Sequence, residues 1–150
     1  MIDLAYFQSI CEPFKIDAKL VYAIAMAESA LDPNTARFEP GWKYWYKIDD
    51  FSKSLRITRD TEKVFQATSW GLMQVMGTVA RELGFNKHLT ELTKPNYNVA
   101  IGVRKLQELF NKYDKLEDVI SSYNQGYPRK NEDGEYRNKY YVNTVLNFYY

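Results

Sequence analysis

Residues 17–29 read DAKLVYAIAMAES, and this stretch decides the fold class. Its apolar side chains recur at the spacing of one helix face, as Leu20 and Ile24 illustrate. Asp17 can cap the first turn, and Asp32-Pro33-Asn34 stops the helix. The spacing therefore predicts an amphipathic helix from Asp17 to about Leu31, with its apolar face against a core.

Glu28 lies on the apolar side of this predicted helix, four residues after Ile24 and eight after Leu20. Apolar surroundings disfavour an ionised carboxylate, so its pKa rises and it can hold a proton near neutral pH. A general acid for glycoside cleavage needs this property. The alternative is a glutamate that reaches solvent because the helix ends one turn later.

Helical spacing continues along the chain, and no long run alternates between apolar and polar residues. Val99, Val103 and Leu106 have core spacing within one of these segments. Further helices are predicted over residues 77–83, 96–113, 116–123 and 140–148, with a loop over 124–138. The chain is expected to be mainly α, a helical bundle forming one domain over residues 1–150.

A long connection, residues 34–69, separates the first predicted helix from the second. It is rich in aromatic residues, including Trp42, Tyr44, Trp45 and Tyr46. Connections of this length usually carry function or short structure of their own. We expect an insert or lid that covers substrate; the alternative is an ordered apolar flap that completes the core.

The composition excludes several classes of protein. Lys and Arg number 20 against 19 Asp and Glu, and no dense basic run is present, so nucleic-acid binding is not expected. No apolar run is long enough for membrane insertion, and no basic segment followed by an apolar one marks a secretory signal. The lone Cys11 and lone His88 predict neither a disulfide nor a metal site. The aromatic content of 16% suits either a groove that stacks on flat ligands or a core with extra rings.

Two further segments place amide and hydroxyl groups beside glycines. Residues 69–76 read SWGLMQVM, and residues 121–126 read SSYNQG. Such groups orient a polyhydroxylated ligand, and a glycine lets the backbone approach it. Taken singly, Gln74 is equally consistent with a surface amide, and Asn124 with a helix end.

Four motifs, taken in their order along the chain, resemble those of the lysozyme-like soluble lytic transglycosylases of glycoside hydrolase family 23. The motifs are Glu28-Ser29, Gly71-Leu72-Met73-Gln74, Ser122-Tyr123-Asn124-Gln125-Gly126 and Tyr141-Val142. Asn98 and Gly102 also match an Asn-x3-Gly pattern of that family. The resemblance spans about residues 17–146 and implies a lysozyme-like bundle, with the insert between the catalytic helix and the Gly-Leu-Met-Gln motif.

The resemblance implies cleavage of the β-1,4 bond between N-acetylmuramic acid and N-acetylglucosamine in bacterial peptidoglycan, with formation of a 1,6-anhydro ring. Glu28 would be the single catalytic residue, first acid and then base, and no cofactor or metal would be needed. The implied partner is the peptidoglycan glycan strand, and a monomer is expected. The implied substrate-binding residues are Gln74, Met73, Tyr123, Asn124, Tyr141 and Ser29, the last of them more as a support of the helix end.

The sequence also departs from the family pattern. Alanine is common in the family at the places of Ser122 and Gln125, and a glutamate at the place of Arg137; here Glu135 lies two residues away. The insert is longer than usual and resembles that of phage-encoded muramidases that read Ser-Trp-Gly-Leu-x-Gln. We therefore expect a phage endolysin or a virion-associated domain, made in the host cytoplasm and acting on the cell wall after holin-type release or as part of a virion.

Two alternatives stay open, and a third is disfavoured. A hydrolytic muramidase of goose-lysozyme type would keep Glu28 as acid and use a second carboxylate to position water, with Glu39, Asp49, Asp60 or Glu62 as candidates. An inactive peptidoglycan-binding module would use the fold and its aromatic groove without catalysis. A nucleic-acid binder that stacks bases on Tyr and Trp lacks the basic stripe it would need.

Overall fold

The predicted helix after Asp17 is α2, Ala18–Ser29, in the computed structural model, which describes residues Met1–Tyr150. The Asp17 carboxylate accepts a hydrogen bond from the Lys19 N–H at 2.9 Å, as a capping residue does. Ala30 and Leu31 follow with positive φ angles of 52° and 64°, and they end the helix. The expectation for this segment is confirmed, with its end two residues earlier.

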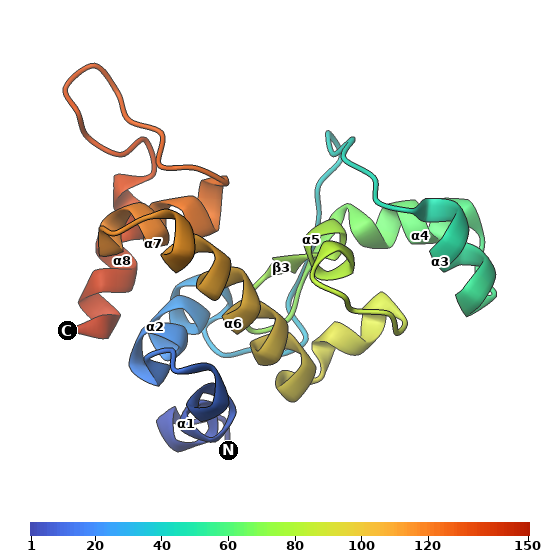
Figure 1. Ribbon diagram of the computed structural model, residues 1–150, viewed down its shortest axis with the longest axis horizontal. Helices are drawn as coiled ribbons and strands as arrows, with labels where there is room; N and C mark the ends of the chain where they lie inside the picture. The colour runs from blue at the N-terminus through green and yellow to red at the C-terminus, as the bar shows by residue number, and fades with distance from the viewer.

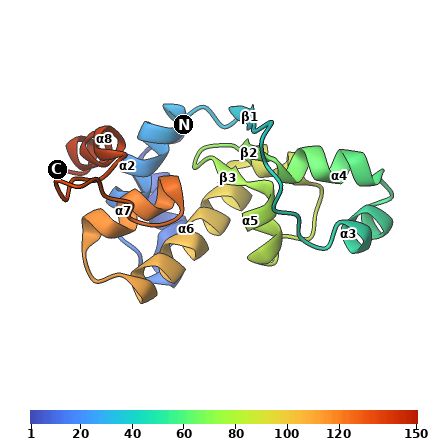
Figure 2. The same cartoon turned by 90° about the horizontal axis from the view of Figure 1, so that it is seen from above.

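Eight α-helices make the chain mainly α, as expected from the sequence. Figure 1 shows α6 running through the middle, with α1, α2, α7 and α8 at one end and α3 and α4 at the other; Figure 2 shows the same division from above. The remaining helices are α1 Leu4–Cys11, α3 Ile48–Leu55, α4 Arg59–Gln66, α5 Gly77–Glu82, α6 Pro95–Lys112, α7 Leu116–Gln125 and α8 Lys139–Tyr149. Two 3-10 segments are η1 Glu12–Phe14 and η2 Leu89–Thr93.

One apolar core joins the bundle around α2 and α6. It contains fully buried side chains from both helices, among them Ile24, Val99 and Leu106. Helix α8 packs along α2 and contributes Val142 and Val145. The core therefore places the C-terminal end of α2, where Glu28 lies, beside α8.

A three-stranded antiparallel sheet connects the two ends of the molecule, and no sequence pattern predicted it. Its strands are β1 Ala36–Phe38, β2 Thr68–Trp70 and β3 Val75–Met76, in the order β1-β2-β3. Strands of two or three residues are too short to show an alternating pattern. The sheet brings the residue pair Arg37 and Ser69 into register, so the start of the insert lies beside its end.

Asn98 and Gly102 fix the turn between β2 and β3 onto α6. The Asn98 side chain accepts from the Met73 N–H at 2.8 Å and donates to the Trp70 carbonyl at 2.7 Å. A Cβ at Gly102 would lie 2.2 Å from the Met73 sulfur, and one at Gly71 would lie 2.4 Å from the Leu92 carbonyl oxygen. At Gly71 the near atom is backbone, so only glycine fits there; at Gly102 a Cβ would displace the buried Met73 side chain, which gives the glycine of the Asn-x3-Gly pattern a structural reason.

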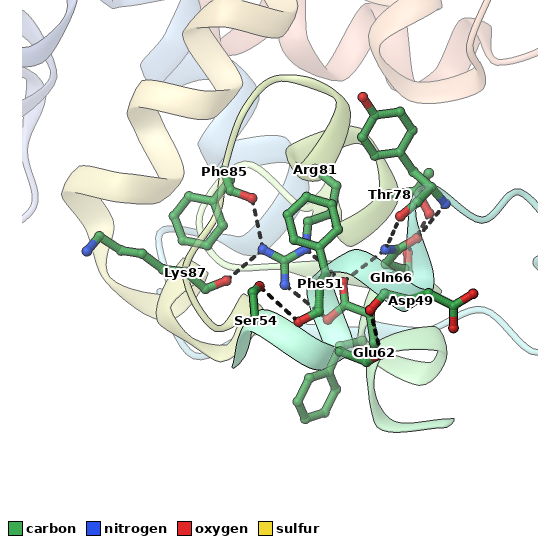
Figure 3. A network of polar contacts seen from close by, with 12 residues as sticks. Asp49, Phe51, Ser54, Glu62, Gln66, Thr78, Arg81, Phe85 and Lys87 are labelled. Atoms are coloured by element: carbon green, nitrogen blue, oxygen red, sulfur yellow. Dashed lines mark hydrogen bonds and ion pairs between the residues drawn. The ribbon is translucent and has the colours of Figure 1, made fainter. Parts of the chain in front are cut away.

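The insert contains α3 and α4 and is tied to α5 by a buried ion pair (Figure 3). Glu62 and Arg81 are both fully buried, with the Arg81 Nε 2.7 Å from the Glu62 Oε1. Arg81 also donates to the carbonyl oxygens of Phe85, at 2.8 Å, and Lys87, at 2.6 Å. Every polar atom of the pair faces a partner, as buried charges require.

The aromatic stretch of the insert is held by hydrogen bonds as well. Trp42 Nε1 donates to the Thr78 hydroxyl on α5 at 3.0 Å. The Gln66 side chain accepts from the Tyr46 N–H at 2.9 Å and donates to the Tyr46 carbonyl at 2.8 Å. The insert thus has helices of its own and rests against the body of the molecule.

No helix in the chain combines the length and the apolar character that crossing a membrane requires.

Candidate functional site

Glu28 lies in the last turn of α2, half-buried, with its carboxyl group turned toward α8. The Tyr141 hydroxyl donates a hydrogen bond to the Glu28 Oε1 at 2.7 Å. Burial raises the pKa of the Glu28 carboxyl, and the Tyr141 hydrogen bond and the nearby Lys105 charge oppose that rise. The predicted orientation of Glu28 toward the core side of the helix agrees with this placement.

A cavity of about 300 Å³ opens at Glu28. Its walls come from five parts of the chain: the end of α2, the strand β1, the β2–β3 turn, and the facing helices α6 and α7. Polar side chains predominate in the lining, including Arg37, Glu39, Gln74, Lys105, Tyr123 and Asn124. Such a lining suits a ligand with many hydroxyl and amide groups.

Ser29 does not line this cavity. Its hydroxyl donates to the Leu72 carbonyl oxygen at 2.8 Å and lies 3.1 Å from the Ala25 carbonyl oxygen. The side chain therefore ties the end of α2 to the β2–β3 turn, in the supporting role that the sequence suggested.

Gln74 lines the cavity while its amide is occupied by the backbone. The Nε2 donates to the carbonyl oxygens of Gly71, at 2.8 Å, and Thr35, at 3.0 Å, and the Oε1 accepts from the Ser69 hydroxyl at 3.1 Å. Gln74 has a φ of 47°, in the left-handed region. The amide thus joins a strained turn to Thr35, the residue before β1, at the cavity wall.

Met73 is fully buried, and its side chain packs on Gly102 and not in the cavity lining. Its carbonyl oxygen accepts a hydrogen bond from the Tyr123 hydroxyl at 2.8 Å. Burial raises the pKa of the Tyr123 and Tyr141 phenols well above their ordinary range, so both stay protonated donors. Tyr123 belongs to the cavity lining, whereas Met73 does not and is linked to the lining through this bond.

Asn124 stands at the cavity edge, exposed at the end of α7. Its Oδ1 accepts from the Asn138 side chain at 3.0 Å, which leaves its amide nitrogen without a protein partner. Of the predicted binding residues, Asn124 is therefore the one whose polar atom is available to a ligand.

Lys105 is a cavity residue that the sequence reasoning missed. Its Nζ donates to the Tyr123 carbonyl at 2.7 Å and lies 3.9 Å from the centre of the Tyr123 ring. Burial lowers its pKa to about 8, and the Glu28 charge opposes that change. The available signal was spacing, because Lys105 follows Asn98 and Gly102 by seven and three residues and shares their helix face.

Glu39 is the one of the four alternative carboxylates that lines the Glu28 cavity. It forms an ion pair with Arg37, with Nε and Oε1 3.2 Å apart. Glu62 forms its buried ion pair with Arg81, and Asp49 pairs with Arg59. Asp60 lies in the wall of a different cavity, on the insert.

The loop before α8 brings no carboxylate into the Glu28 cavity. Glu135 pairs with Lys139 at 3.0 Å, with half of its side chain exposed, and Arg137 is exposed. Neither residue belongs to the cavity lining. No group of three or more His, Cys, Asp or Glu side chains is placed to hold a metal ion.

The geometry provides one carboxyl group with a raised pKa at the wall of an open polar cavity, two neutral phenols and one ammonium group. A carboxyl group with a raised pKa can give a proton to a bound ligand and take one back.

Comparison with known proteins adds one positive finding. The family model described as Transglycosylase SLT domain matches residues 5–144. No curated protein and no solved structure matches the chain.

Proposed function

We propose that this chain, which belongs to the transglycosylase SLT domain family, cleaves the β-1,4 bond between N-acetylmuramic acid and N-acetylglucosamine by lytic transglycosylation. The family has lytic transglycosylase or lysozyme-like activity on peptidoglycan. The observation that carries the proposal is the Glu28 carboxyl, half-buried at the cavity wall and held at one oxygen only.

In the first step, protonated Glu28 gives its proton to the glycosidic oxygen as the bond from that oxygen to C1 breaks. The raised pKa supplies the protonated form, because burial disfavours the charged one. The N-acetyl group of the substrate can stabilise the positive charge at C1, so a second enzyme carboxylate is not required.

In the second step, the Glu28 carboxylate takes the proton of the muramoyl 6-hydroxyl while the oxygen of that hydroxyl bonds to C1. The 1,6-anhydro ring closes, and Glu28 returns to its protonated form without consuming water. Tyr141 and Lys105 stabilise the carboxylate that exists between the steps, by a hydrogen bond and by charge.

Asn124 and Tyr123 are proposed to contact the sugar at the cavity, and Gln74 to keep the wall in place. Asn124 is exposed there with a free amide nitrogen, and the Gln74 amide is bonded to three other groups. Met73 and Ser29 contribute through the backbone contacts that shape the turn.

One observation favours hydrolysis as a second candidate. Glu39 lines the same cavity as Glu28, so a second carboxylate is present to orient water. The products separate the two reactions, since hydrolysis leaves reducing ends heavier by one water. Mass spectrometry of digested peptidoglycan is expected to give anhydromuramoyl ends. If only reducing ends are found, transglycosylation is ruled out and hydrolysis, with Glu39 orienting the water, takes its place.

The Glu28→Gln variant tests the assignment of the acid. We expect lytic activity to fall by about 10²–10⁴-fold, the usual share of general acid–base catalysis, with an unchanged circular dichroism spectrum. Glu135→Gln is the matched control, because Glu135 is a glutamate on the surface outside the cavity. A Glu28→Gln protein that lyses walls at the wild-type rate would rule out Glu28 as the acid, and an inert wild type would favour the binding-module alternative.

The phage origin, the route to the cell wall and the monomeric state stay predictions. For the insert, residues 34–69, we propose a fixed extension of the cavity at Glu28 and not a moving lid. The buried Glu62–Arg81 pair and the Trp42–Thr78 hydrogen bond support this proposal.

A further inference from the structure

A second cavity, of about 290 Å³, lies on the insert between the segment after β1 and helix α4. Figure 2 shows that segment running from β1 toward α3, with α4 beside it. Three aromatic rings line the cavity, from Phe38, Trp42 and Trp45. None of the chemistry proposed for Glu28 uses these rings.

Two of the three aromatic side chains of this second cavity are open to solvent. Trp45 is 40% exposed and Phe38 is 51% exposed. Exposed apolar side chains that gather within a polar rim are typical of binding surfaces. The rim here consists of Glu39, Asp60 and Lys63.

The walls of the second cavity are held in place before any ligand arrives. The Trp42 Nε1 bonds to the Thr78 hydroxyl, and the Glu39 N–H donates to the Ala67 carbonyl at 2.8 Å. Beneath α4, the buried Glu62–Arg81 pair anchors the helix to α5 (Figure 3). A preformed wall reduces the entropy lost on binding.

Strand β1 forms the partition between the two cavities. Successive side chains of a strand point to opposite faces, and accordingly Arg37 lines the Glu28 cavity while Phe38 lines the second one. Glu39 belongs to both linings. The two cavities therefore adjoin at Glu39.

We propose that the second cavity is a subsite for an additional N-acetylated sugar ring of the strand bound at Glu28, with Trp45 as its stacking residue. This inference rests on the proposed function, which supplies the glycan. The C–H face of a sugar suits an indole ring, and Glu39, Asp60 and Lys63 offer acceptors and a donor to its polar groups. Glu39 is paired with Arg37, so Asp60 and Lys63 leave the rim close to neutral, which suits an uncharged sugar better than the acidic peptide stem.

Binding of uncleaved oligosaccharides tests the subsite without relying on catalysis. The Glu28→Gln protein is titrated calorimetrically with chitobiose and with chitohexaose, because only the longer ligand can span both cavities. We expect the hexaose to bind more tightly, and Trp45→Ala in the same background to weaken hexaose binding by about tenfold and remove most of that advantage.

Phe148→Ala is the matched control, since Phe148 on α8 is 42% exposed and lines neither cavity. It is expected to bind like its parent, and Phe38→Ala to behave like Trp45→Ala. Unchanged hexaose binding in both insert variants overturns the subsite, as does an equal loss in Phe148→Ala. A wild type that fails to cleave peptidoglycan would instead overturn the proposed function and leave length-dependent binding intact.

Discussion

Two glutamates, Glu62 and Glu28, lie on helices within polar networks, yet their surroundings differ. The Glu62 carboxylate is fully buried and receives three hydrogen bonds, two from Arg81 at 2.7 and 3.0 Å and one from Gln66 at 2.9 Å. Glu28 receives one, from Tyr141, and lines an open cavity. Glu62 is thus fully buried and Glu28 partly buried, and the free carboxyl oxygen beside a cavity distinguishes Glu28.

The difference shows how the same side chain serves structure in one place and chemistry in another. The Glu62 carboxylate, with both oxygens bonded to a buried arginine, ties α4 to α5 and has no oxygen left for a ligand. A carboxyl with one partner and a desolvated environment is poised to exchange a proton with a ligand. Substitutions at these two glutamates and at their neighbours test this comparison.

The largest expected effect follows from truncating Glu62. Glu62→Ala leaves the Arg81 charge buried without a partner, so we expect the free energy of unfolding to fall by about 3–5 kcal/mol. Urea denaturation measures this change. A double variant, Glu62→Leu with Arg81→Met, is expected to recover most of the loss, and a single variant as stable as wild type would contradict the structural role of the pair.

Glu28→Gln provides the contrasting stability measurement. Because burial raises the pKa of Glu28, the folded protein keeps a proton that the unfolded chain has released, and wild-type stability falls as pH rises through that interval. At pH 7 the Glu28→Gln protein is therefore expected to be at least as stable as wild type. The advantage should disappear in acid, where both side chains are uncharged.

An intermediate effect is expected from Lys105→Met. Removing the positive charge raises the pKa of Glu28, so the alkaline limb of the activity profile moves to higher pH. The pH dependence of the free energy of unfolding changes too. The Lys105 pKa is about 8 in the folded protein and 10.5 ordinarily, so the unfolded chain binds more protons between these values and wild-type stability gains there as pH rises.

The Lys105→Met protein lacks this gain, and Lys112→Met serves as its control at an exposed position of the same helix. Identical pH profiles for wild type and Lys105→Met would show that the Lys105 charge does not act on the Glu28 carboxyl.

The smallest expected effect concerns Ser122. Its hydroxyl is the one buried side-chain polar atom without a hydrogen-bond partner. Ser122→Ala is expected to stabilise the fold by about 1 kcal/mol, because a buried unmatched hydroxyl is unfavourable. The neighbouring Ser121 donates to the Asn138 side chain at 2.8 Å, so Ser121→Ala should destabilise it. Thermal unfolding compares the two, and a destabilised Ser122→Ala protein would reveal a partner for Ser122.

The helices of the bundle followed from the sequence because each carries its own apolar period and its own end signals. The segments predicted over 77–83, 96–113, 116–123 and 140–148 correspond to α5, α6, α7 and α8 within two residues at each end. Helices α1, α3 and α4 were not predicted. The last two lie in the insert, where burial of Glu62 and Gln66 hides the usual apolar stripe.

For the candidate site, the sequence indicated which segments matter better than what each side chain does. Gln74 and Met73 were both expected to line the site: Gln74 belongs to the cavity lining with its amide engaged in the turn, whereas Met73 does not line the cavity and engages its backbone in the turn. Lys105 was not recognised, because one lysine on a helix carries no motif. Its position over the Tyr123 ring arises from the packing of α6 against α7.

The sequence by itself determined the mainly helical class, the position of Glu28 on the inner side of α2 and the order of the motifs, since helical periodicity and local end signals fix these. Only the tertiary structure decided that Tyr141 and Lys105 face Glu28, that Glu39 shares its cavity and that Glu62 does not. These contacts join residues far apart in the chain. The protonation behaviour of a carboxyl depends on such neighbours and on burial, and neither can be inferred from the local sequence.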